Sequence, residues 1–281
     1  MQILEVTRFG VRSAVIRLRH RTMPLQFVIY PMIHMASLSF YADVTARLAT
    51  ADVIVAEGVR RTTRRSPLIA ALTLSYRILK FNRRVDLVEQ DIDFAAFTAS
   101  GIPVINPDVD ADEFRSSWRR APWTHRLMMW CVLPVVILGR LFGGSAAIWS
   151  TAMQVDDLPT DEEEDWALDA PELEEAICGE RDRRLIAALR QLHEQRGSEN
   201  IEVAVVYGAG HVGAIVHALC SPDGYLVRSG EWLTVVDLVG DPALAYRLDP
   251  QRSITRAKAA VRARETAREA ADLLSRESRA K

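Results

Sequence analysis

VAVVYGAGHVGAIVHAL, residues 203–219, decides the fold, because an apolar run, a glycine-rich turn and a second apolar run follow one another directly. The first run has the length and the β-branched composition of a buried strand, and the second has the length of a helix. Glycines between them allow a tight turn. The stretch therefore predicts a strand-turn-helix unit of an α/β protein, with His211 where the strand ends and the helix begins.

Three other apolar runs have strand length, and two of them precede helical patterns. The runs span residues 25–34, 52–57 and 84–91, and the helical patterns span 35–50 and 66–81. Alternating apolar residues within the first thirty positions indicate two further strands, joined near Gly10. A later helix is predicted from Pro171 to Arg196, with Asp169 as N-cap and Gly197 as stop, and strands follow within 225–238.

This alternation predicts an α/β fold with a mixed, largely parallel sheet flanked by helices, formed by one domain over residues 1–250. An apolar and charged helical insertion at 111–165 interrupts the alternation. Residues 251–281 have helix-forming composition with interspersed charges, so we expect a charged C-terminal helical tail.

Composition excludes some classes of partner. Lys and Arg number 35 and Asp and Glu 37, so a net charge of −2 gives nucleic acid no general attraction, and we expect no nucleic-acid partner. The three cysteines lack metal-binding spacing and their number is odd, which indicates a reducing compartment. The first twenty residues lack the pattern of a signal peptide. We therefore expect a cytoplasmic protein without a signal peptide.

The apolar stretch at 127–149 is long enough to span a bilayer, but Arg140 interrupts it. A span would also separate two halves of the chain that both supply candidate site residues. Residues typical of a membrane interface come just before it: Arg115, Trp118, Arg119, Arg120, Trp123 and Arg126. The sequence predicts either peripheral membrane association through 112–149 or burial of this helix in a homodimer or the core.

Chemically versatile side chains follow several predicted strands. His34, Glu57, Asp91 and His211 each come at or just after the end of an apolar run. Because ligands of open α/β sheets bind at the carboxyl ends of the strands, these side chains are expected at one rim. Two imidazoles and a carboxylate there can ligate a divalent metal or act as general acid and base. Asp91 also fits the role of a helix N-cap.

Arg181 is unusual because it interrupts the apolar stripe of the helix predicted at 171–196. An arginine in such a stripe is costly unless it is paired or faces a polar cavity. It either reaches solvent at the edge of the stripe or points into the rim site, where it would bind a carboxylate or stabilise an oxyanion.

Gly208, Gly210 and Gly213 also match the spacing of a dinucleotide-binding turn. That interpretation needs several more strand-helix units after the turn, and the remaining chain is too short for them. The glycines are therefore interpreted as a turn that presents His211.

The chain resembles the TraB/PrgY/GumN family of the TIKI superfamily. The similarity rests on a strand-end histidine near the N-terminus, on VIVAEGV (53–59), on ERD (180–182) and on GAGH (208–211), and VEQDI (88–92) is similar to an acidic strand end of the family. Members carry two Gly-x-x-His motifs with a Glu and an Arg between them, and some are metal-dependent proteases.

The resemblance implies that Glu57 and Arg181 are the Glu and Arg between the two histidine motifs. Only the second motif is intact, since the first reads PMIH (31–34), with Pro31 in the place of glycine.

Two functions follow as hypotheses. The first is a metal-dependent hydrolase of the TraB/TIKI type, with a peptide bond as its expected target. His34, His211 and Glu57 would hold a Mn, Co or Zn ion, and Asp91 is a candidate additional ligand. Arg181 would bind or polarise a peptide or protein substrate. The second is a non-enzymatic, membrane-proximal regulator that binds or sequesters a peptide or protein partner through 112–149 and the C-terminal helix.

Overall fold

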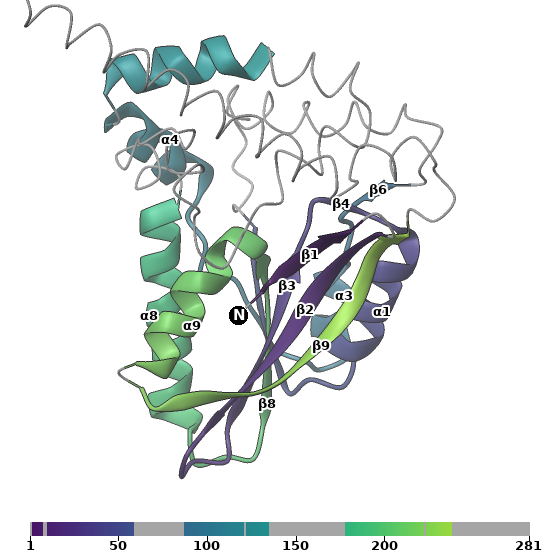
Figure 1. Ribbon diagram of the computed structural model, residues 1–281. Helices are drawn as coiled ribbons and strands as arrows, with labels where there is room; N and C mark the ends of the chain where they lie inside the picture. Colours follow the sequence, from purple (N-terminus) through teal and green to yellow (C-terminus); the bar gives the residue numbers. More distant parts are fainter. Residues whose placement is uncertain are drawn as a thin grey trace, which may run out of the picture.

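The computed structural model describes residues 2–7, 10–58, 87–120, 122–134, 178–221 and 223–237. Within these residues a central sheet carries helices on both faces (Figure 1). The predicted helix at 66–81, the cap Asp169, most of the insertion at 111–165 and the tail at 251–281 lie outside the described residues. The predicted α/β class is confirmed.

The main sheet of the described part is mixed. Its seven strands are β1 (Leu4–Thr7), β2 (Gly10–His20), β3 (Gln26–Met32), β5 (Val53–Ala56), β7 (Val104–Ile105), β8 (Glu202–Gly208) and β9 (Tyr225–Asp237). β3, β8, β5 and β7 are neighbours in that order and pair in parallel. β2 pairs antiparallel with β1, β3 and β9. The parallel half brings the carboxyl ends of β3, β8 and β5 to the same edge.

The described part of the strand predicted at 84–91 lies outside the main sheet. This part contains β6 (Val88–Glu89), which pairs antiparallel with β4 (Met35–Ala36) in a separate two-stranded sheet. Both residues of β6 are only half-buried, which suits a small ribbon at the edge of the core.

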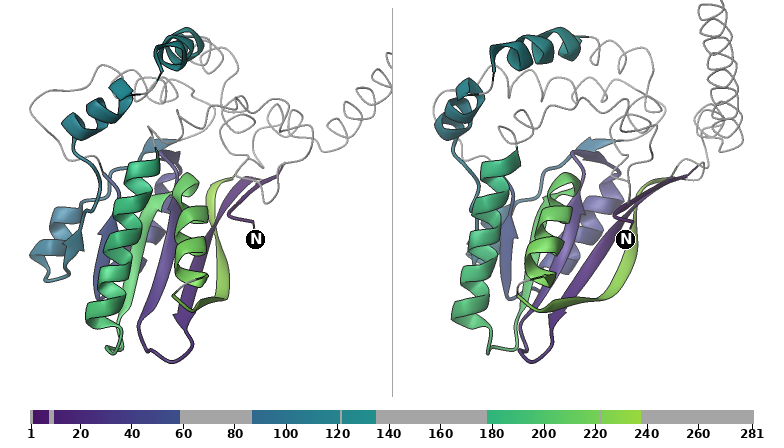
Figure 2. Two further views of the ribbon diagram at one scale, coloured as in Figure 1. Left: turned by 90° about the vertical axis from the view of Figure 1, so that its left-hand side faces the viewer. Right: turned by 60° about the vertical axis from the view of Figure 1, so that its left-hand side comes forward.

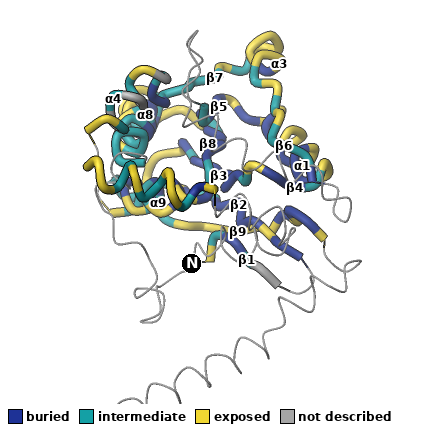
Figure 3. Tube along the Cα trace, turned by 90° about the horizontal axis from the view of Figure 1, so that it is seen from above, coloured by how far each residue is buried: buried dark blue, intermediate teal, exposed yellow. Residues whose placement is uncertain are grey.

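Helices cover both faces of the main sheet (Figures 2 and 3). They are α1 (Leu38–Leu48), α3 (Phe94–Ala99), α8 (Glu180–Arg196) and α9 (Val212–Cys220). α8 and α9 bury Leu185, Leu189 and Ile215 against one face. α1 buries Phe40 and Val44 against the other. Each such side chain contributes about 1.5–3 kcal/mol on burial, so the two apolar layers hold the strand ends in place.

The predicted helix after His34 is confirmed as α1, with one error in its buried stripe. Ser37 is the N-cap, and its hydroxyl accepts a hydrogen bond from the Phe40 N–H at 3.2 Å. The helical spacing of residues 35–50 puts Leu38 on one stripe with Tyr41, Val44 and Leu48, but Leu38 is 70% exposed, whereas the other three and Phe40 are buried. Leu38 is the first residue of the helix, and it lies outside the face that meets the sheet.

The described part of the insertion is helical. α4 spans Ala111–Arg120, and residues 123–134 form a further helix. Among the described residues, no helix combines the length and the apolar composition needed to cross a bilayer.

Candidate functional site

Three strand ends bring the predicted residues to one edge of the sheet. His34 follows β3, Glu57 directly follows β5, and His211 follows β8, which lies between those two strands. Glu57 is also fixed through its backbone, because its N–H donates to the Val206 carbonyl of β8 at 2.9 Å. The placement predicted from the strand ends is confirmed for the backbone.

Arg181 and Glu57 form a buried ion pair at this edge. Arg181 Nη2 donates to Glu57 Oε1 at 2.5 Å, and the two side chains are 13% and 17% exposed. The other carboxylate oxygen, Glu57 Oε2, accepts the Gly208 N–H at 2.5 Å. Of the two alternatives for Arg181, the structure therefore has the arginine inside the rim cluster and not at the solvent edge of the stripe.

Asp108, which the sequence reasoning missed, completes the pairing of Arg181. Its carboxylate is fully buried and takes Arg181 Nε and Nη2, both at 2.8 Å. The Gly58 and Val109 N–H groups also donate to it, at 3.1 and 2.8 Å. Asp108 comes three residues after β7, so the rule that functional side chains follow strands would have found it had the short strand been recognised.

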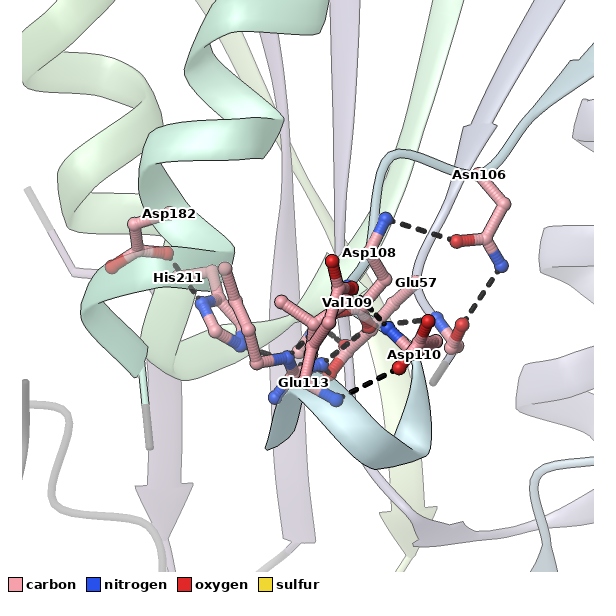
Figure 4. A network of polar contacts seen from close by, with 11 residues as sticks. Glu57, Asn106, Asp108, Val109, Asp110, Glu113, Asp182 and His211 are labelled. Carbon is pink, nitrogen blue, oxygen red and sulfur yellow. Dashed lines mark hydrogen bonds and ion pairs between the residues drawn. The ribbon is translucent and has the colours of Figure 1, made fainter. Parts of the chain in front are cut away.

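His211 lies in η3 (Ala209–His211), between β8 and α9. Its Nδ1 is 2.6 Å from Asp182 Oδ1, and its Nε2 is 3.7 Å from Glu57 Oε1 (Figure 4). Tyr207 packs edge-on to the imidazole, with ring centroids 5.6 Å apart. Asp182, next to Arg181 on α8, was also missed, although the ERD triplet that carries it had been noted.

A second ion pair fixes the start of α8 against α4. Arg184 Nη1 and Nη2 donate to the two carboxylate oxygens of Glu113, each at 2.8 Å. Glu113 Oε2 accepts the Asp110 N–H, and Asp110 Oδ1 accepts the Glu113 N–H, each at 2.8 Å, so the two residues form a capping box (Figure 4). The loop that carries Asp108 is thereby tied to the helix that carries Arg181.

The electrostatics favour charged forms of the central pair. Burial alone would raise the pKa of Glu57, but the neighbouring His211, the charge of Arg181 and the Gly208 N–H outweigh it and hold that pKa well below its usual range. Burial alone would lower the pKa of His211, but Asp182 and Glu57 outweigh it and raise that pKa to about 9. At neutral pH, Glu57 is a carboxylate and His211 an imidazolium.

His34 and Asp91 do not join this cluster. His34 is exposed, and none of the described hydrogen bonds or ion pairs of Glu57, Arg181 or His211 involves it. Asp91 is exposed too, and the N-cap of α3 is Asp93, whose Oδ1 accepts the Ala95 N–H at 3.0 Å and the Ala96 N–H. The interpretation of Asp91 as that cap is wrong by two residues.

The described side chains fit the predicted metal poorly. Within the described ranges, no group of three or more His, Cys, Asp or Glu side chains is arranged to hold a metal ion. Both oxygens of Glu57 already accept hydrogen bonds, one from a guanidinium, which itself supplies a positive charge at this position. Binding of Mn, Co or Zn by His34, Glu57 and His211 stays a prediction.

The glycine turn at 208–213 lets the Glu57 carboxylate approach the backbone at Gly208. A Cβ on Gly208 would lie 3.0 Å from Glu57 Oε2, whereas a Cβ on Gly210 or Gly213 would meet nothing within 4 Å. The Gly208 N–H, which a pyrophosphate would need, already binds the Glu57 carboxylate. The turn therefore permits close approach of a carboxylate, in agreement with the interpretation that disfavoured a dinucleotide.

No family model, curated protein or solved structure matches this chain. The resemblance to the TraB/PrgY/GumN family thus stays a prediction that rests on the short motifs.

Proposed function

We propose that this chain is a TraB-like hydrolase that cleaves peptide bonds, with its reaction centre at the cluster of Glu57, Arg181 and His211. The observation that supports this most is that these three side chains, from three separate segments, meet in one largely buried cluster. Convergence of an ionised carboxylate, an imidazolium and a guanidinium is typical of sites that move protons and stabilise an oxyanion.

Unused donors in the cluster suit a carbonyl substrate. In the described part of the chain, Arg181 donates from Nε and Nη2 only, so its Nη1 group has no hydrogen-bond partner. The hydroxyl of Tyr207 is buried and likewise lacks a partner there. His211 Nε2 is too far from Glu57 for a hydrogen bond at 3.7 Å. Donors of this kind can bind a peptide oxygen and the negative charge that develops on it.

In this mechanism Glu57 acts as the general base and His211 as the general acid. Glu57 accepts a proton from water as the water oxygen adds to the peptide carbonyl carbon. His211 donates its Nε2 proton to the peptide nitrogen as the carbon–nitrogen bond breaks, which leaves a carboxyl group and an amine. Glu57 then releases its proton to water and His211 takes one up from water, which restores the starting state. Because its low pKa makes Glu57 a weak base, the mechanism depends on oxyanion stabilisation by Arg181.

The test is cleavage of a mixed peptide library by the purified protein, followed by mass spectrometry. We expect His211→Ala and Glu57→Gln each to lower the rate at least about a hundredfold, in line with the usual contribution of a general acid or base. His217→Ala is the matched control and should keep the wild-type rate, because His217 is an exposed histidine of the adjoining helix α9. Equal rates for wild type and His211→Ala would exclude the proposal, as would the absence of cleavage by wild type.

Metal dependence is tested with the same library. Chelator-treated protein is assayed alone and after addition of Mn, Co or Zn, in wild type and in His34→Ala. Activity that needs a metal and is lost in His34→Ala would support the metal site predicted from the sequence. Activity that persists after chelation, with His34→Ala unchanged, would support the metal-free roles of Glu57 and His211.

One observation favours the second candidate function, that of a membrane-proximal regulator. In the helix at 123–134, Trp123, Leu127 and Trp130 are 68%, 54% and 44% exposed, and their spacing places them on one side of the helix. Arg119 and Arg120 are exposed just before this helix. Apolar side chains beside arginines suit the surface of an anionic membrane.

Sedimentation with vesicles that contain phosphatidylserine tests this candidate. A Trp123→Ser/Trp130→Ser variant should bind less than wild type, whereas Leu38→Ser, which changes an exposed apolar residue of α1, should bind equally. If the tryptophan variant binds as wild type does, the membrane surface is assigned wrongly.

A further inference from the structure

A cavity of about 580 Å³ lies at the end of the sheet opposite the Glu57–His211 cluster. It is bounded by the end of β2, the turn to β3 and its first residue, the loop before β8 and the first half of β9. Its principal polar lining residues are Arg17, Arg19, His20, Asn200, Arg228 and Ser229. β8 begins beside this cavity and ends at the cluster, and its 7 residues separate the two places by roughly 20 Å. The turn between β2 and β3, whose residues Met23 and Pro24 line the cavity, lies at the lower end of the sheet in Figure 1.

Positive charge in the cavity exceeds the carboxylates that could balance it. Arg17 Nη1 pairs with Glu202 at 2.5 Å, and Gln26 Nε2 donates to the same carboxylate at 3.1 Å. Arg19 reaches only a neutral partner, the Gln26 Oε1, at 3.1 Å. Within the described residues, Arg228 has no hydrogen-bond or ion-pair partner. Of these three guanidinium groups, only that of Arg17 pairs with a carboxylate among the described residues.

A β-bulge positions Arg228. In the antiparallel pairing of β2 with β9, Arg17 opposes Ser229 and Leu18 opposes Val227, so Arg228 is an extra residue without an opposite partner. Bulges redirect a side chain and are common beside functional sites. In a regular ladder, successive side chains of β9 would point to opposite faces of the sheet. The bulge breaks this alternation, and Arg228 lines the same cavity as Arg17 and Arg19.

We propose that this cavity binds a small organic dianion, either a phosphate monoester or a dicarboxylate, between Arg19 and Arg228. Two guanidinium groups without carboxylate partners match two negative charges and can form bidentate hydrogen bonds to them. Asn200 and Ser229 supply neutral polar groups, and Met23 and Pro24 supply an apolar wall. Small-molecule sites occupy about 300–1,000 Å³, so the cavity has room for an organic part beside the anionic group.

Calorimetric titration of the full chain tests the proposal with three probes: inorganic phosphate, glycerol 3-phosphate and succinate. Ionic strength is held constant with chloride. We expect at least one probe to bind, with glycerol 3-phosphate favoured if the ligand is a phosphate monoester and succinate favoured if it is a dicarboxylate. Arg228→Gln and Arg19→Gln should each weaken that binding at least about tenfold, because each removes charge-assisted hydrogen bonds.

Arg119→Gln is the matched control, because it removes one positive charge from an exposed site on α4 and should leave the affinity unchanged. Circular dichroism of each variant verifies the fold. The proposal is overturned if no probe binds the wild type, or if both cavity variants bind as tightly as Arg119→Gln. Since the cavity is separate from the Glu57–His211 cluster, neither outcome depends on peptidase activity.

Discussion

Replacement of Arg181 by leucine leaves two buried carboxylates without their cation. Asp108 is fully buried and the Glu57 side chain is 17% exposed, so water cannot substitute for the guanidinium. Removal of one partner from a buried ion pair costs about 3–5 kcal/mol. Because a domain has a free energy of unfolding of about 5–15 kcal/mol, the variant is expected to be marginally stable at pH 7.

Urea denaturation followed by fluorescence measures this loss of stability. Arg183→Leu is the matched control: Arg183 is a neighbour on α8, its side chain is 59% exposed, and it pairs with Glu180. An exposed pair of this kind contributes about 0–1 kcal/mol. If Arg181→Leu costs no more than Arg183→Leu, the assignment of Arg181 as the buried counter-ion is refuted.

Two further predictions concern the same edge of the sheet. The pKa of His211 is raised from 6.5 to about 9, so its contribution to the free energy of unfolding should be complete below pH 6.5 and be lost as the pH rises through 9. In urea denaturation the advantage of wild type over His211→Gln should therefore fall by on the order of 3 kcal/mol across this range. An advantage independent of pH would contradict this. Gly208→Ala should lower the melting temperature, since its Cβ would approach Glu57 Oε2 to 3.0 Å, whereas Gly210→Ala should not, and equal effects of the two would contradict the role given to Gly208.

The sequence predicted the strand ends well because local patterns carry that information. Apolar runs bounded by glycine or a charged residue located β3, β5 and β8, and the rule for parallel sheets then placed Glu57 and His211 together. Arg181 was found because a charge in an apolar helix stripe is costly, and its partner proved to be a carboxylate at that rim.

The site residues that the sequence reasoning missed or misplaced depend on tertiary contacts. β7 has two residues, too few for a recognisable alternation, so Asp108 after it went unnoticed. Asp182 resembles any surface acid of a helix until the turn after β8 places His211 beside it. His34 and Asp91 follow apolar runs as Glu57 and His211 do, yet both are exposed, because a position near a strand end does not fix the direction of a side chain.

The most direct measurement is an NMR titration of the His211 imidazole, assigned by comparison with His211→Gln. The cluster proposed as the reaction centre requires an imidazolium held by Asp182 and Glu57. We expect a pKa of about 9 in wild type and a lower value in Asp182→Asn, which removes the charged partner of Nδ1. A wild-type pKa at or below the ordinary 6.5, unchanged in Asp182→Asn, would contradict the central claim that these side chains form one coupled proton-transfer centre.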